Sequence, residues 1–243
     1  MIWFIIATLV AFFIKGLCGF ANTLIFNGIL SYTANNINIS PLEVVLGYPS
    51  NIILVWKERK SLNWKIWLPL TALVVAGSIP GIFLLKHTDA GLLKVIFGIA
   101  VIVIGVEMLF REMKSNRESS NRKPGGSKLV LILIGIISGL LCGLYGVGAL
   151  LAAYVSRVAE NSHEFKANIC VVFVVENTIR IILYVATGIL TLSVLKQVVI
   201  LIPFMLAAVF LGMKSSSVLN EKIIKKIVIV LLILSGIVLI INN

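Results

Sequence analysis

Long apolar stretches separated by short polar segments account for most of the chain. Most of these stretches approach the roughly 20 residues that an α-helix needs to cross the hydrocarbon core of a bilayer. The pattern therefore predicts an all-α, polytopic membrane protein with eight hydrophobic runs. The runs lie at about residues 1–33, 41–56, 66–85, 90–110, 129–156, 167–187, 194–213 and 223–241. The second run is short and contains two prolines, so we expect that span to be kinked or partly unwound.

A single long polar segment, residues 111–128, divides the chain. Its mixed charges and its Pro-Gly-Gly sequence are typical of a linker. It separates a first transmembrane repeat, residues 1–110, from a second, residues 129–243. Both halves open with a glycine-containing apolar run, and Asn51 and Asn177 occupy matching places. These matches indicate a duplicated unit.

The 129–156 run is too long to be one membrane helix. Its 28 residues would extend about 42 Å as an unbroken helix, against about 30 Å of bilayer hydrocarbon. The run has no proline, and glycine adopts non-helical backbone angles at little cost. We therefore predict that glycines break it and that an earlier cluster breaks the first run. The two clusters are Gly16 and Gly19, and Gly139, Gly143, Gly146 and Gly148.

Two interpretations of these glycines stay open. At a break, the start of a half-helix exposes backbone N–H groups and the positive end of a helix dipole, which together favour an anion. Alternatively, small residues four positions apart, such as Gly139 and Gly143, let membrane helices pack closely.

The composition excludes a soluble globular domain. Hydrophobic residues make up 59% of the chain and charged residues 13%, and the mean hydropathy is +1.08. The net charge of +11 comes from basic residues in short loops, without a contiguous patch for nucleic acid. The apolar start lacks a preceding basic region, so we interpret it as a retained span and not as a secretory signal.

The positions of the basic residues favour one topology. If both glycine-bearing runs fold back as two short helices, one side of the membrane carries 16 lysines and arginines and the other carries 3. If each run crosses once, the counts are 11 and 8. Because cytoplasmic loops are rich in Lys and Arg, we prefer the fold-back arrangement. It places the amino terminus outside a bacterial-type plasma membrane, the 111–128 linker in the cytoplasm and the two halves in opposite orientations.

Inverted repeats with broken helices are typical of secondary transporters, whose binding site lies near the membrane midplane. Charged side chains at that depth need a partner or water. Lys15, just before the first glycine, could neutralise an anion there, or its long side chain could extend to the membrane surface. Asn22, Asn51 and Asn177 could donate hydrogen bonds to substrate or to unwound backbone.

The acidic residues of the apolar runs have less specific interpretations. Glu176 and Arg180 are spaced as an i, i+4 pair, and we interpret them as structural. Glu43 and Glu107 lie near the ends of their runs, where they could carry protons but where ordinary interfacial positions suit them as well.

The paired glycine motifs resemble those of the TauE/SafE sulfite exporter (TSUP) family over essentially the whole chain. Gly16, Gly19, Gly143, Gly146 and Gly148 fit that family's glycine-rich runs. Ala21-Asn22-Thr23 and Ala149-Leu150 stand where further glycines are expected, which leaves the exact substrate open. The resemblance implies transport of small sulfur-containing anions of the sulfite, sulfonate or thiosulfate class, coupled to an ion gradient.

The expected substrate site therefore combines residues of both breaks with nearby polar side chains. Its members are Lys15, Gly16, Gly19, Asn22, Asn51, Gly143, Gly146, Gly148 and Asn177. An alternative function is a transmembrane dithiol relay, because Cys18 and Cys142 lie in corresponding breaks. The sequence has no zinc-spaced His/Cys cluster, Walker motif or Ser-His-Asp arrangement, so we expect no enzyme activity, metal or cofactor. The expected partners are a small anion and the lipid bilayer.

Overall fold

The computed structural model describes residues 1–30, 36–84 and 148–241, with scattered residues between 95 and 110 and between 132 and 140. In these ranges every regular element is a helix, so the all-α prediction is confirmed. The elements are α1 (Ile2–Cys18), α2 (Asn22–Leu30), α3 (Asn36–Glu58), the short 3-10 helix η1 (Arg59–Ser61), α4 (Trp64–Leu84), α7 (Ala149–Val158), α8 (Ser162–Ala186), α9 (Leu192–Val218) and α10 (Glu221–Ile241). The 111–128 linker and most of the runs at 90–110 and 129–147 lie outside the described residues, so the count of eight runs stays a prediction.

Several of these helices are suited to a lipid environment. Residues Ile39–Ser61, Ser162–Ala186 and Leu192–Val218 are long and apolar enough to cross a bilayer, and Ile2–Cys18 and Trp64–Pro80 are shorter apolar helices. Large apolar side chains lie on the outside of the bundle, as Val199 and Leu211 do on α9. A helix that is apolar on its outer face as well as its inner face is typical of a membrane span. The chain is an integral membrane protein.

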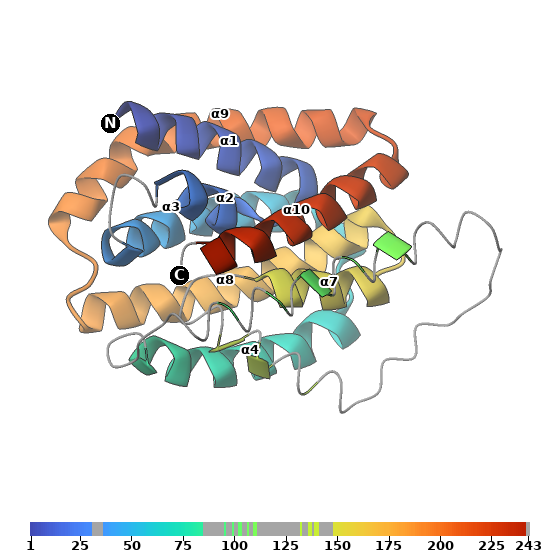
Figure 1. Ribbon diagram of the computed structural model, residues 1–243, viewed down its shortest axis with the longest axis horizontal. Helices are drawn as coiled ribbons and strands as arrows, with labels where there is room; N and C mark the ends of the chain where they lie inside the picture. Colours follow the sequence, from blue (N-terminus) through green and yellow to red (C-terminus); the bar gives the residue numbers. More distant parts are fainter. Residues whose placement is uncertain are drawn as a thin grey trace.

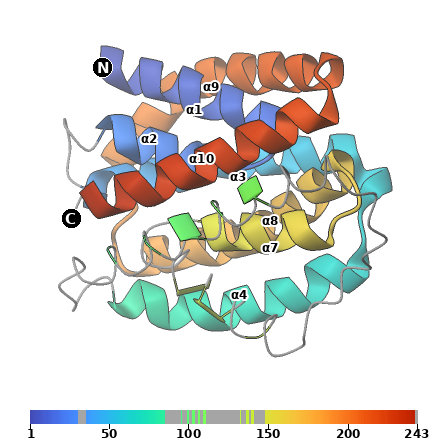
Figure 2. The same ribbon diagram turned by 45° about the vertical axis from the view of Figure 1, so that its right-hand side comes forward.

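The helices lie roughly along one axis, and three of the described turns gather at one end of the bundle (Figures 1 and 2). At that end, the turn after α3 meets the turns before α8 and after α9. His163 Nδ1 lies 2.8 Å from Glu58 Oε2, Asn63 Nδ2 donates to Glu164 Oε1 at 2.9 Å, and Lys57 Nζ donates to a carbonyl oxygen near the end of α9. The start of α1 and the end of α10 lie at the opposite end.

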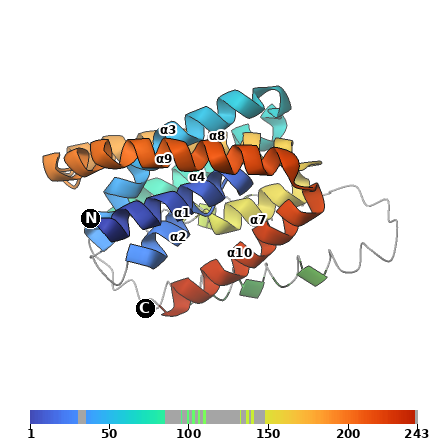
Figure 3. The same ribbon diagram turned by 90° about the horizontal axis from the view of Figure 1, so that it is seen from above.

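The first apolar run is broken at its predicted glycine cluster. α1 ends at Cys18, and Gly19 adopts a left-handed conformation with φ of 88°. Ala21 also has a positive φ, of 71°, before α2 begins at Asn22. Through these two residues the chain reverses, and α2 returns alongside α1 (Figures 1 and 3). α1 and α2 therefore form a hairpin whose bend lies inside the protein.

The expectation of an unwound second span is wrong. α3 continues from Asn36 to Glu58 through both Pro41 and Pro49. Each proline removes only one backbone donor, and the remaining helical hydrogen bonds hold the span together. The helix also begins five residues before the predicted run, and it is long enough to cross the bilayer.

Two glycine crossings bring helices of the two halves into backbone contact. A Cβ on Gly16 of α1 would lie against the carbonyl oxygen of Val209 and 3.1 Å from the Cα of Gly212 in α9. A Cβ on Gly139 would lie 2.8 Å from the Cα of Gly77 in α4. The packing interpretation is therefore confirmed for Gly139, and it applies to Gly16 as well.

Candidate functional site

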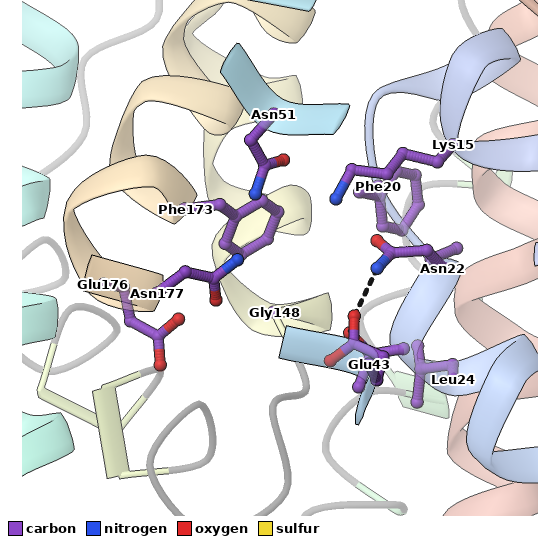
Figure 4. Close-up of a pocket in the computed structure, with 12 residues that line it drawn as sticks. Lys15, Phe20, Asn22, Leu24, Glu43, Asn51, Gly148, Phe173, Glu176 and Asn177 are labelled. Atoms are coloured by element: carbon purple, nitrogen blue, oxygen red, sulfur yellow. Dashed lines mark hydrogen bonds between the residues drawn. The ribbon is translucent and has the colours of Figure 1, made fainter. Parts of the chain in front are cut away.

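A buried cavity lies where the α1–α2 hairpin meets α3, the start of α7 and α8. Its enclosed volume is about 20 Å³. Aromatic walls come from Phe20 and Phe173, and polar side chains come from four different helices. Figure 4 shows the ends of Lys15, Asn22 and Asn51 directed into the same space.

Two helices begin at this cavity. Asn22, in the first turn of α2, lines one side, and Gly148, directly before α7, lines the other. No acidic side chain occupies the first turn of either helix, and α7 has no side-chain cap. The two helices leave the cavity in opposite directions (Figures 1 and 3). Their starts therefore present backbone N–H groups and the positive ends of two dipoles to one space.

Gly148 is a glycine for a steric reason. A Cβ at this position would fall onto the ring of Phe173 in α8. The bare backbone of Gly148 thus lets the start of α7 approach α8 and the cavity closely. This close approach does not require a special backbone angle, because Gly148 has φ of −92°.

Lys15 lies in the last turn of α1 and is buried, with 1% of its surface exposed. Its ammonium group lies 5.9 Å from the centre of the Phe12 ring. The ion pairs among the described residues are His163–Glu58 and Arg180–Glu176, and Lys15 belongs to neither. The interpretation that this side chain extends to the membrane surface is wrong. A buried ammonium without an ion-pair partner is energetically costly, so this position favours a negative charge in the cavity.

The asparagines also converge on the cavity. Asn51 of α3 is fully buried, and neither its Oδ1 nor its Nδ2 has a hydrogen-bond partner in the described part of the chain. Asn177 of α8 lines the same space. Asn22 Nδ2 donates to Glu43 Oε1 (Figure 4). Because buried amides normally find partners, Asn51 has hydrogen-bonding capacity to offer a ligand in the cavity.

Glu43 of α3 is a cavity residue for which the sequence left two interpretations open, a proton carrier and an ordinary interfacial side chain. The interfacial interpretation is wrong, because only 2% of Glu43 is exposed. Its Oε1 accepts hydrogen bonds from Asn22 Nδ2 and from Thr23 Oγ1, the latter at 2.8 Å. The carboxylate thus joins the start of α2 to α3.

Gly47 is a second position that sequence reasoning missed. A Cβ there would lie 3.3 Å from Glu43 Oε1 and 3.5 Å from Asn177 Nδ2. A usable signal was present, because Glu43, Gly47 and Asn51 are spaced four apart and so lie on one face of a helix. A polar residue, a glycine and a second polar residue on one face of an apolar span mark the side that faces the cavity.

The predicted i, i+4 pair is confirmed. Arg180 Nε lies 3.6 Å from Glu176 Oε1, and both side chains are buried. Arg180 Nη2 also donates to Ser40 Oγ and to Tyr184 Oη, each at 2.9 Å. This network ties α8 to the start of α3, and Glu176 reaches the cavity wall at its edge.

The remaining predicted site residues lie elsewhere or outside the described residues. Gly16 faces α9, and Gly19 lies against Lys166, whose Cγ would be 3.0 Å from an added Cβ. Neither glycine lines the cavity. Gly143 and Gly146 lie outside the described residues, so their roles stay predictions. Cys142 does as well, and the dithiol hypothesis that pairs it with Cys18 is untested.

This helical membrane protein has a buried polar cavity at which two helices begin. That architecture is typical of membrane transport proteins. The chain belongs to the sulfite exporter TauE/SafE family, whose family model matches residues 4–239. The resemblance seen in the sequence is thereby confirmed. Membership identifies the chain as a membrane transporter of the sulfur-anion exporter type, which agrees with the expectation that it is not an enzyme. No curated protein and no solved structure matches the chain.

Proposed function

We propose that this protein is a secondary transporter of small sulfur-containing anions of the sulfite, sulfonate or thiosulfate class, which bind in the cavity beside Lys15. The observation that carries the proposal is the burial of Lys15 without an ion-pair partner among the described residues, at a point where two helix starts converge. An anion in the cavity would give Lys15 a direct ion-pair partner. A neutral or cationic solute would leave the lysine and both dipoles unmatched.

The shape of the substrate follows from the directions of the donors. Backbone N–H groups come from the starts of α2 and α7, and side-chain amides come from Asn51 and Asn177. A sulfur oxyanion presents several oxygens in different directions around one centre, so it can accept from several helices at once. Phe20 and Phe173 offer apolar contact to the part of the ligand that carries no oxygen.

We further propose that the two halves are inverted repeats. The glycine crossings support this proposal, because Gly16 meets Gly212 in the same way as Gly139 meets Gly77. The surrounding contacts also correspond. Gly212 approaches the carbonyl oxygen of Phe13, three residues before Gly16, and Gly77 approaches that of Ile136, three residues before Gly139. This correspondence matches Gly16 with Gly139, whereas the spacing of glycines in the sequence matches Gly16 with Gly143, four residues later.

The orientation in the membrane is part of the same proposal. The end of the bundle that gathers the turns after α3, before α8 and after α9 carries most of the basic residues of these loops. The positive-inside tendency supports a cytoplasmic location for this end and an external amino terminus. With the breaks near the middle of the bundle, the cavity would then be reached from either side as the repeats move against each other.

Transport by purified protein in proteoliposomes tests the proposed substrate class. We expect saturable uptake of labelled thiosulfate that excess sulfite or methanesulfonate inhibits and that choline or a neutral sugar does not. Empty liposomes and liposomes containing heat-denatured protein serve as controls. Saturable transport of a neutral or cationic solute that is unaffected by these anions would contradict the proposal.

A further inference from the structure

Three charged side chains line the cavity: Lys15 of α1, Glu43 of α3 and Glu176 of α8. A fourth, Arg180 of α8, forms an ion pair with Glu176. Glu176 and Arg180 neutralise one another within their own ion pair. The charges that the cavity itself must balance are therefore those of Lys15 and Glu43.

Glu43 has no cationic partner of its own in the described residues. The two donors to its carboxylate, Asn22 and Thr23, are both neutral, and both reach Oε1. No described donor reaches Oε2. Arg180 and Lys15 are both near enough to act on Glu43 electrostatically, Arg180 more strongly, but neither forms an ion pair with Glu43 within 4.0 Å. Figure 4 shows the two groups separated by Asn22, both facing the open space.

This arrangement creates a conflict for an anionic ligand. An anion placed beside Lys15 also lies close to the Glu43 carboxylate, and like charges repel strongly where water is excluded. With Glu43 ionised, Lys15, Glu43, Glu176 and Arg180 sum to zero charge. With Glu43 protonated, the same group carries a net charge of +1 and the repulsion disappears.

We propose that Glu43 is a proton-binding site and that one proton enters the cavity with each anion. The inference rests on the proposed anion site and adds the coupling ion to it. The proton adds to the free Oε2, giving a neutral carboxylic acid whose O–H donates a hydrogen bond to an oxygen of the anion. On release the O–H bond breaks, the electron pair stays on Oε2, and the proton leaves with the anion.

The neighbouring groups single out Glu43 for this role. Glu176 faces the same region from α8, but it has a cationic partner of its own, because its Oε1 lies 3.6 Å from Arg180 Nε. The polar side chains that touch Glu43 from α2 are uncharged. The remaining group that could take up a proton with the anion is Lys15, if its amine were neutral in the empty cavity. The test therefore has to separate Glu43 from Lys15.

Calorimetry of thiosulfate binding to the full-length protein in detergent provides the test. Thiosulfate keeps its charge across the neutral range, so protons taken up on binding come from the protein, and titrations in buffers of different ionisation enthalpy count them. For wild type we expect uptake of about one proton and, above the titration range of the site, an affinity that falls about tenfold per pH unit. Binding that is independent of pH, without proton uptake, would overturn the inference and leave the anion site standing.

Single-residue variants show which side chain takes up the proton. Glu43→Gln mimics the neutral acid, so it should bind thiosulfate without proton uptake and with a flat pH profile. Lys15→Arg keeps a permanent positive charge and should still take up a proton. Glu160→Gln, at an exposed carboxylate away from the cavity, should behave as wild type. Proton uptake that survives in Glu43→Gln but is lost in Lys15→Arg or in Glu176→Gln would assign the proton elsewhere and overturn the inference.

Transport measurements distinguish a failure of the proton site from a failure of the anion site. Liposomes with Glu43→Gln should exchange labelled for unlabelled thiosulfate, but a pH gradient should no longer drive accumulation. Accumulation equal to wild type in Glu43→Gln would contradict the proton site alone. If no variant and no wild-type sample binds or transports thiosulfate at any pH, the anion site and the proton site both fail.

Discussion

At the scale of single residues, the cavity depends on positions that lack side chains as much as on those that have them. Gly47 lies between Glu43 and Asn177, and its missing methyl group leaves both side chains room to meet a ligand. Ala21 shows the opposite case, because its φ of 71° is a conformation that glycine adopts far more readily. Gly47 therefore leads to a prediction about binding, and Ala21 leads to a prediction about stability.

Gly47→Ala should weaken anion binding without destabilising the protein. The added methyl group would lie 3.3 Å from Glu43 Oε1, which would have to shift slightly, and at an ordinary contact distance of 3.5 Å from Asn177 Nδ2. We expect the dissociation constant for thiosulfate to rise about tenfold, equivalent to about 1.4 kcal/mol. The apparent melting temperature should stay equal or rise, since alanine favours a helix over glycine. Wild-type affinity in this variant would remove Gly47 from the site.

Ala21→Gly should stabilise the fold. Glycine removes the conflict between the alanine Cβ and the left-handed backbone, which is worth about 1 kcal/mol net of the entropy that glycine adds to the unfolded chain. Thermal denaturation in detergent should therefore show a higher apparent melting temperature. Ala21→Val provides the converse variant and should lower that temperature, because a branched side chain tolerates positive φ poorly. A lower melting temperature for the glycine variant would contradict the assigned backbone conformation.

At the scale of elements, the two glycine crossings hold α1 against α9 and α4 against the helix that contains Gly139. Backbone contact of this kind depends on van der Waals packing, because lipid offers no hydrophobic driving force between helices. The cavity lies beside the bend between α1 and α2 and the start of α7. We therefore expect the crossings to determine fold and yield.

Gly212→Val should lower the yield of folded protein. Its side chain would meet the carbonyl oxygen of Phe13 and the Cα of Gly16, so α1 and α9 would have to separate, at a cost of about 2 kcal/mol or more. The matched control is Ala207→Val, an addition to the exposed surface of the same helix. Size-exclusion chromatography of detergent extracts should show reduced monodisperse protein for Gly212→Val alone. Equal yields for the two variants would contradict close packing at this crossing.

At the scale of the whole molecule, the described turns define two ends. In a variant with Cys18, Cys142 and Cys170 replaced by serine, single cysteines at Lys60 and Thr191 should be labelled from opposite sides of the membrane. Lys60 follows α3 at the end that gathers the basic turns, and Thr191 precedes α9 at the other end. We expect an impermeant maleimide added to intact cells to label Thr191→Cys and not Lys60→Cys. Labelling of both from one side would contradict the fold-back topology.

The sequence predicted local features of the site better than distant contacts. Glycine positions predicted the break after Cys18 and the location of Lys15 beside it. Helical spacing predicted the pairing of Glu176 with Arg180. The burial of Glu43 could have been predicted from its place on one helix face with Gly47 and Asn51. The contact of Gly16 with Gly212 could not be predicted in the same way, because it depends on which faces of α1 and α9 turn toward each other, and apolar residues cover most of both helices.

The central claim is that the buried charge of Lys15 binds the transported anion, and thiosulfate binding to Lys15→Met tests it most directly. Methionine keeps the length and apolar stem of the side chain and removes the charge. The account predicts monodisperse protein whose affinity for thiosulfate falls at least about thirtyfold, while Lys196→Met, at an exposed lysine of α9, binds as wild type. Wild-type affinity in folded Lys15→Met would contradict the account.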